Sequence, residues 1–300
     1  MRFAAAGIVF SFILPGLGCG PGTPPSVRPD PALMRLVPPD TLLLAGARLD
    51  HVRETPFYRE QLGPRGAAAL AGLTGTAGID LRQDISEILA AFNGTELVVM
   101  SRGRFSEREI EARLGRPVAG RRSYKGYQII GSDDAALVMV DAATVIAGRP
   151  ERLRAILDQQ GQSAGPPPAL KHMLGTVERA NQFWVISCGG FGRRMAPRST
   201  GSDILNGILT RLSNLKVTGS VSDGVVVDAE GQCATPEQAE TLQSALRMMI
   251  GLARLRARDR PALTGLLDGI AVSRRERLVC ADARWPGKLL ARVLAEAGSR

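Results

Sequence analysis

The sequence is poor in the residue types from which most catalytic and metal sites are built. Its 300 residues include two histidines and four cysteines, and no two cysteines form a Cys-x-x-Cys pair. A histidine-rich metal site is therefore excluded, and the cysteine spacing does not match that of a zinc site. A Ser-His-Asp triad would need His51 or His172, and the neighbouring Asp50 and His51 do not have a catalytic arrangement. We therefore expect a protein that is not an enzyme and that has no cofactor or metal ion.

Lysine and aromatic residues are also scarce, although the chain carries a net charge of +9. Nearly all of its cations are arginines, which are spread along the whole chain, and aromatic residues make up 4% of it. Proteins that bind single-stranded nucleic acid interleave basic and aromatic side chains. We therefore expect no nucleic-acid partner and attribute the charge to arginine usage, with attraction to acidic lipid headgroups as a by-product.

No apolar run beyond the amino terminus reaches the length of a membrane span without a charge. At the amino terminus, a positive residue precedes the uncharged, mostly apolar stretch Phe3–Leu14, and small residues lead to Cys19. This is the layout of a secretory signal peptide, predicted to comprise residues 1–18. Cys19 resembles the lipidated cysteine of the lipobox in bacterial lipoproteins. Gly16 stands where that pattern has a large aliphatic residue, so cleavage without lipidation and an uncleaved anchor are the alternatives.

Residues 19–37 are predicted to form an extended tether between Cys19 and a folded body. The twelve residues from Gly20 to Pro31 include five prolines and two glycines, which disfavour a helix or a central strand. Where such a segment adopts polyproline II geometry, it spans about 3 Å per residue. Tether and lipobox together predict an exported protein that is lipid-anchored to a bacterial membrane and faces the periplasm or the cell surface. Its expected partners are this membrane and an unknown envelope protein.

The body repeats one unit, a β-hairpin followed by a helix. The clearest hairpin signal is Asn93-Gly94 between two apolar runs, and Asp223-Gly224 marks another. Thr235 followed by Pro236 is typical of a helix start. The copies span residues 85–114, 127–157, 215–255 and 269–294. These repeats predict an α+β fold, with antiparallel sheets that carry helices on one face.

A polar and then proline-rich stretch at residues 161–169 divides the body. We expect it to be a linker between two similar α+β domains, residues 38–160 and residues 170–300. The same composition would be unusual inside a sheet or a helix.

Three short motifs resemble those of a group of exported bacterial proteins of unknown function. They are Pro39-Asp40 before an apolar strand, Gly78-Ile79-Asp80, and Tyr124-Lys-Gly-Tyr127. The resemblance covers mainly residues 38–160. It implies an exported α+β protein, and it transfers no catalytic residue because none is known in the group.

Two groups of arginines are candidates for contact with an anion or a lipid headgroup. Arg193, Arg194 and Arg198 lie in or near a glycine-rich stretch whose spacing matches neither a P-loop nor a Rossmann fingerprint. Its other interpretation is a flexible loop at the end of a strand. Arg254 and Arg258 belong to a run of four arginines at the end of a predicted long helix. There the other interpretation is a solvated helix end whose cations complement the helix dipole.

The sequence thus favours a membrane-tethered, exported protein that acts by binding or as a scaffold. The alternative is a carrier or sensor of lipid or another amphiphile, with an apolar groove between sheet and helices. A hydrolase with an unfamiliar site ranks last. Cys233 and Cys280 are the one pair considered for a disulfide, which an exported protein would permit.

Overall fold

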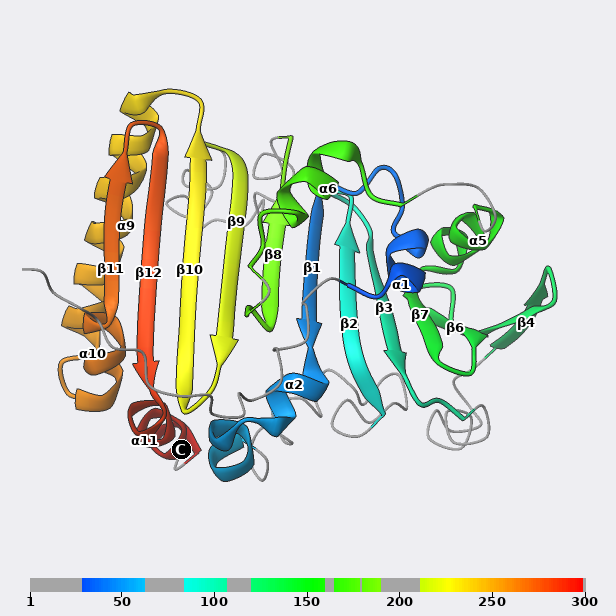
Figure 1. Ribbon diagram of the computed structural model, residues 1–300, viewed down its shortest axis with the longest axis horizontal. Helices are drawn as coiled ribbons and strands as arrows, with labels where there is room; N and C mark the ends of the chain where they lie inside the picture. Colours follow the sequence, from blue (N-terminus) through cyan, green and yellow to red (C-terminus); the bar gives the residue numbers. More distant parts are fainter. Residues whose placement is uncertain are drawn as a thin grey trace, which may run out of the picture.

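A computed structural model describes residues 29–62, 84–106, 120–159, 165–178, 180–189 and 211–298. In these residues, a single antiparallel sheet of 12 strands forms the centre of the molecule (Figure 1). Its strand order is β11-β12-β10-β9-β8-β1-β2-β3-β7-β6-β5-β4. The expected α+β class is confirmed: antiparallel strands pair throughout and helices pack on the sheet.

The described strands and helices have the following bounds. The strands are β1 (Leu43–Arg48), β2 (Ile85–Phe92), β3 (Leu97–Gly103), β4 (Gly120–Tyr124), β5 (Tyr127–Gly131), β6 (Ala136–Asp141), β7 (Thr144–Gly148), β8 (Phe183–Ser187), β9 (Leu212–Val221), β10 (Gly224–Cys233), β11 (Ile270–Arg275) and β12 (Leu278–Pro286). The helices are α1 (Pro31–Leu36), α2 (Leu49–Glu54), the π-helix η1 (Tyr58–Leu62), α5 (Pro150–Asp158), α6 (Pro168–Leu174), α9 (Pro236–Arg256), α10 (Pro261–Asp268) and α11 (Gly287–Gly298).

The hairpin turns lie where the sequence predicts them. Asn93 and Gly94 join β2 to β3, and Gly94 has a φ of 100°, a conformation that glycine adopts without steric cost. The Asn93 side-chain oxygen accepts hydrogen bonds from the backbone N–H groups of Thr95 and Glu96, at 3.0 and 2.9 Å. This side chain therefore stabilises the turn from within, as is common for asparagine.

The helix starts agree with the sequence in two cases and differ in a third. α5 begins at Pro150, and α9 begins at Pro236 with the Thr235 hydroxyl accepting from the Gln238 N–H at 3.3 Å. Pro286, by contrast, is the last residue of β12, and α11 begins one residue later. α10 has no counterpart among the helices predicted from the sequence.

In the first half of the chain, helices cover one face of the sheet with a continuous apolar core. Leu44, Leu89, Met100 and Ile146 of four neighbouring strands are fully buried on this face. α1, α5 and α6 supply the residues that pack on them: Leu33, Leu36, Leu153, Ile156, Leu157 and Leu170. The buried face is thus built from alternate residues along each strand.

In the second half of the chain, helices cover the opposite face. Trp184, Thr218, Asp228 and Asp282 are cross-strand partners from β8 to β12, so they share the face on which Trp184 joins the first core. The apolar residues of β10 and β12 point the other way, where Cys233 and Val279 pack with α9. Figure 1 shows α1 and α6 on the near side of the sheet and α9 on the far side. The side of the sheet on which these helices pack therefore changes between β8 and β9, although Leu137 and Val145 are buried on the other face of the first half as well.

The strands of the two predicted domains belong to one sheet. β1 of the first half pairs with β8 of the second, from Leu43 opposite Ser187 to Ala47 opposite Phe183. α6 was assigned to the second domain, yet its Leu170 packs in the same core as Leu157 of α5. The division into two domains at residues 161–169 stays a prediction, while the structure places a continuous ladder and a shared core across it.

Candidate functional site

The predicted tether meets the body at Asp30, earlier than expected. The tether was predicted to reach residue 37, but α1 begins at Pro31, and Leu33 and Val37 are fully buried. Asp30 caps this helix, because its side chain accepts a hydrogen bond from the Ala32 N–H at 2.7 Å. An aspartate followed by proline is a helix start signal, which the proline count of this region obscured. We call Asp30 and its partners the tether root.

Asp30 is held by two side chains of the sheet. Its backbone N–H donates to the Glu87 carboxylate, with distances of 3.1 and 3.3 Å to the two oxygens. Its own carboxylate accepts from Arg102 Nε at 3.0 Å. Asp30 is therefore attached to β2 and β3 through both its backbone and its side chain.

Four polar residues form a row across the sheet beneath Asp30. Arg48, Glu87, Arg102 and Thr144 are successive cross-strand partners on β1, β2, β3 and β7. Arg102 also donates to the Thr144 hydroxyl at 2.6 Å. We call these four residues the polar row. Because polar groups at a protein interior need partners, Arg102 connects β3 to β7 through Thr144, and Glu87 and Arg102 connect β2 and β3 to Asp30.

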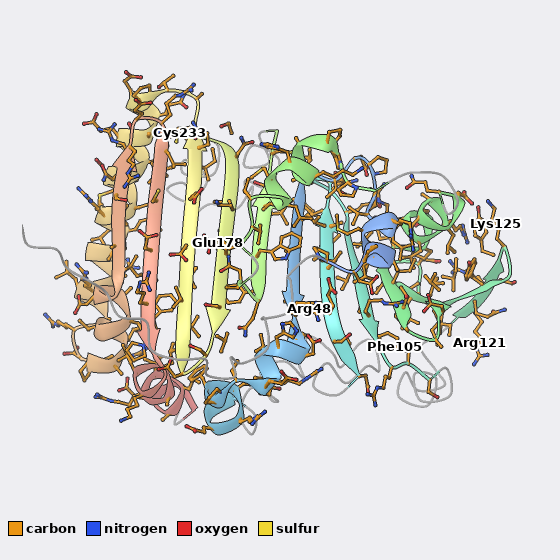
Figure 2. The ribbon with its side chains drawn as sticks, viewed as in Figure 1. Arg48, Phe105, Arg121, Lys125, Glu178 and Cys233 are labelled. Carbon is orange, nitrogen blue, oxygen red and sulfur yellow. The ribbon has the colours of Figure 1, made fainter. Side chains whose placement is uncertain are left out.

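Glu87 is the most buried charged residue of this row, with 5% of its surface exposed. Burial raises the pKa of its carboxyl group to about 7, against the lowering influence of the Asp30 N–H and of Arg48. Arg48 also forms an ion pair with Asp50, whose Oδ2 lies 2.9 Å from Arg48 Nη2. Burial has the largest single effect on Asp50 and raises its pKa, but the hydrogen bond and the charge of Arg48, together with the His51 N–H, outweigh burial and lower that pKa. Figure 2 shows Arg48 at the end of β1 beside α2.

A second feature is the face of β9, β10, β12 and β11 opposite α9, which we call the open face. Its residues include Lys216, Thr218, Asp228, Glu230, Ser273, Arg275, Cys280, Asp282 and Arg284. Lys216 and Glu230 form an ion pair at 3.0 Å, whereas Asp228 and Asp282 stand directly opposite each other. Of the described helices, α9 and α10 pack on the other side of these strands, and α11 contacts β10 and β12. The open face is thus a broad surface of mixed charge on a rigid sheet.

A third feature is a row of exposed apolar side chains on α9. Met248, Leu252 and Leu255 are 53%, 45% and 69% exposed. Among the described residues, Leu97 is the other large apolar side chain with comparable exposure, and it lies on β3. The spacing of four and three residues places the three side chains on one side of the helix. We call them the α9 stripe.

The predicted arginines have different surroundings. Arg254 Nε lies 2.9 Å from the Asp268 carboxylate, and its Nη2 donates to the Leu267 carbonyl at 3.2 Å, so this side chain connects α9 to the end of α10. The Arg258 side chain is 80% exposed and lies 3.8 Å from Asp259. Cys19, Arg193, Arg194 and Arg198 lie outside the described residues.

The histidines and serines do not assemble into a catalytic group in the part of the chain that the structure describes. His51 lies on α2, with its Nε2 3.2 Å from an Arg48 nitrogen. Gly161-Gln-Ser-Ala-Gly165 has the spacing of a nucleophile elbow, but residues 160–164 lie outside the described ranges. This segment follows helix α5 and precedes helix α6, whereas a nucleophile elbow joins a strand to a helix.

The cysteines considered for a disulfide are free. Cys233 faces α9, whereas Cys280 stands opposite Glu230 on the open face, so their side chains point to opposite sides of the sheet. Figure 2 shows Cys233 at the end of β10. Burial raises the pKa of both thiols, which disfavours the reactive thiolate. Within the described ranges there is also no group of three metal-binding side chains.

Comparison with known proteins relates the chain to solved structures alone. No protein-family profile and no curated protein matches it. The chain is similar to the structure of crystal form I of TP0453, with 10% identity and a TM-score of 0.51, over 90% of this chain and 98% of the other. It is also similar to crystal form III of TP0453, with 10% identity and a TM-score of 0.53, over 88% and 97%. At this identity the likeness shows the fold alone.

The described helices were also compared with the requirements of a membrane span. None of them combines sufficient length with sufficient apolar character to cross a bilayer. The longest, α9, is 21 residues long and carries several arginines.

Proposed function

We propose that the chain is an exported protein, tethered to a bacterial membrane through a lipid on Cys19, that acts by binding an envelope protein rather than by catalysis. The open face is the observation that carries this proposal. It presents charged and hydrogen-bonding side chains from four strands, on the side of the sheet opposite the described helices α9 and α10. A sheet face of this composition is stable in water when free, and it can pair with complementary charges on a partner.

The tether root supports the same proposal. A body that is held through an extended chain transmits any pull to the first residue fixed in the fold. Asp30 lies directly before α1, and its groups bind Glu87, Arg102 and the first turn of α1. These contacts let the tether join the body without loosening the sheet that presents the open face.

The chemistry of the open face indicates a partner with both signs of charge. Asp228 and Asp282 place two carboxylates directly opposite each other, which favours a basic group of the partner between them. Arg275 and Arg284 on the same face favour acidic groups. Such a pattern selects partners by charge complementarity more than by apolar area.

Site-specific photo-crosslinking in cells tests the binding surface. A photoreactive residue at Ser273, which is exposed on the open face, is compared with one at Thr241, which is exposed on α9. We expect one defined crosslinked envelope protein from position 273, and its loss when Asp228→Lys and Asp282→Lys are combined. Equal crosslinking from both positions, or a product at 273 that survives the charge reversal, would overturn the proposal.

Metabolic labelling with palmitate tests the tether independently. We expect label in the wild-type chain and none in Cys19→Ala. Equal labelling of the two would show that Cys19 is not the lipidated residue, and absence of label from both would show a secreted protein without a lipid anchor.

A further inference from the structure

We infer that the α9 stripe and the arginines beside it form a second contact surface, which binds an anionic lipid bilayer. This inference extends the proposed membrane tether, but it concerns another part of the chain and does not need Cys19 to be lipidated. It rests on the exposure of the stripe, on the position of the arginines around α9 and on the place of α9 in the molecule.

The stripe is the outer side of a helix whose inner side is already packed. Ala239 and Leu242 are buried against the sheet, and Leu246 and Met249 are packed on the same core. At 100° per residue, Met248, Leu252 and Leu255 lie on the side of α9 turned away from that core. Exposed fractions of 45% to 69% are large for such side chains, and three neighbours in one row form a patch rather than scattered surface residues.

The stripe lies between cationic side chains. By the same helical geometry, Arg247 and Arg254 lie on one side of it and Arg256 lies on the other. Arg258 follows in the turn that ends the helix and is 80% exposed. Residues 247–260 contain five arginines and one acidic residue, Asp259. Apolar residues flanked by arginines are typical of helices that lie in a membrane interface.

The charge pattern favours a bilayer over a second copy of this chain. Two α9 helices packed through the stripe would bring their arginines together, and like charges at a contact are unfavourable. An anionic headgroup layer offers opposite charge on both sides of the stripe and an apolar layer below it. In Figure 1, α9 lies along the β11 end of the sheet.

Two of these arginines attach α9 to neighbouring elements of the fold. Arg247 Nη2 donates to the Val272 carbonyl at 3.0 Å, and Arg254 is paired with Asp268. Both side chains fix α9 against the sheet and α10. Arg256 and Arg258 are therefore the residues to change when the charge of the surface is tested, because their exchange does not break these attachments.

The experiment is vesicle co-sedimentation of the mature chain with Cys19→Ala, so that no lipid anchor contributes. Vesicles contain phosphatidylcholine alone or phosphatidylcholine with phosphatidylglycerol at about three to one. The test variants are the triple exchange Met248→Gln, Leu252→Gln and Leu255→Gln, and the double exchange Arg256→Gln and Arg258→Gln. The matched controls are Leu97→Gln, an exposed leucine on β3, and Arg122→Gln, an exposed arginine on β4.

We expect binding to the anionic vesicles that falls about fivefold for each exchanged arginine, and a loss at least as large for the triple exchange. The controls should bind like the parent chain. Unchanged binding of the triple or the double variant, or equal binding to both vesicle types, would overturn the inference. A concentration-dependent dimer that the triple exchange abolishes would assign the stripe to a second copy and would also overturn it. Failure here leaves the crosslinking result at Ser273 unaffected.

Discussion

Arg102 holds Asp30 across 72 residues of sequence: its Nε lies 3.0 Å from an Asp30 carboxylate oxygen, with both side chains about one third exposed or less. This ion pair joins the residue that caps α1 to strand β3. The same guanidinium contacts Thr144 and lies 3.6 Å from Asp141. Arg102 is thus the residue through which the tether root, β3 and β7 are connected.

Arg102→Met is expected to lower the free energy of unfolding by about 1–3 kcal/mol, because it leaves partly buried acceptors without their donor. Urea denaturation followed by circular dichroism measures this. The control is Arg122→Met, whose pair with Asp133 is exposed, and it should cost less than about 1 kcal/mol. An equal loss of unfolding free energy in the two variants would show that the Arg102 contacts stabilise the fold no more than an exposed ion pair does.

The stability of the protein is expected to depend on pH through Glu87. Its pKa is raised from 4.5 to about 7 in the folded state, so between these values the folded state binds a proton that the unfolded state has released. The free energy of unfolding therefore falls as pH rises from 4.5 to 7, by about 3 kcal/mol in all, and this contribution is constant above pH 7. Urea midpoints at half-unit pH steps measure this slope.

Glu87→Gln isolates that contribution, because glutamine keeps an acceptor for the Asp30 N–H and does not titrate. The free energy of unfolding of the variant should lack the Glu87-dependent decrease between pH 4.5 and 7. All other groups titrate alike in the two proteins, so their contributions cancel when the two free energies are subtracted. Parallel curves for wild type and variant would contradict the raised pKa of Glu87.

Gly46→Ala is expected to destabilise the fold, because a Cβ at this position would lie 2.5 Å from the Trp184 ring and 2.9 Å from Leu89. Overpacking of this kind costs about 1–3 kcal/mol. The matched control is Gly251→Ala on α9, where no atom lies within 4 Å of the added group and the higher helix propensity of alanine should stabilise by up to about 1 kcal/mol. Thermal unfolding should therefore shift in opposite directions, and a shift in the same direction would refute the close contact at Gly46.

Asp30→Ala is expected to loosen the tether root more than it destabilises the whole fold. The exchange removes the cap of α1 and the acceptor of Arg102. Loss of the cap alone should lower the free energy of unfolding by about 1 kcal/mol. Limited proteolysis with a protease that cleaves after arginine should then cut at Arg35 faster than in wild type. Thr235→Ala serves as the control, since it removes the cap of α9 instead. Equal cleavage at Arg35 in all three proteins would contradict the role of Asp30.

The elements that the sequence predicted well are those set by neighbouring residues. Asn93 and Gly94 make a turn because one side chain and one positive φ suffice for it. Thr235 and Pro236 start α9 because the cap bond from Gln238 to Thr235 lies within four consecutive residues. α1 was missed although Asp30 and Pro31 are the same kind of signal, because its six residues become helical through the burial of Leu33 and Leu36.

The candidate surfaces were predicted less well, for a physical reason. Arg254 and Arg258 were noted from their charge, but the exposure of Met248, Leu252 and Leu255 depends on which side of α9 meets the sheet. An apolar residue at helical spacing is more often buried than exposed, and the sequence does not say which side of an amphipathic helix stays free.

The sequence by itself determined the hairpins, the main helix starts, the basic charge and the signal-peptide layout that ends at Cys19, because each depends on composition or on residues close together in the chain. The tertiary structure decided the rest. Period-two alternation gives every strand two faces, and only the pairing of β1 with β8 and of β8 with β9 assigns those faces to a core or to water. That long-range register places helices on opposite sides of the two halves, brings Arg102 to Asp30, and leaves Ser273, Arg275 and Arg284 of the open face and the α9 stripe exposed.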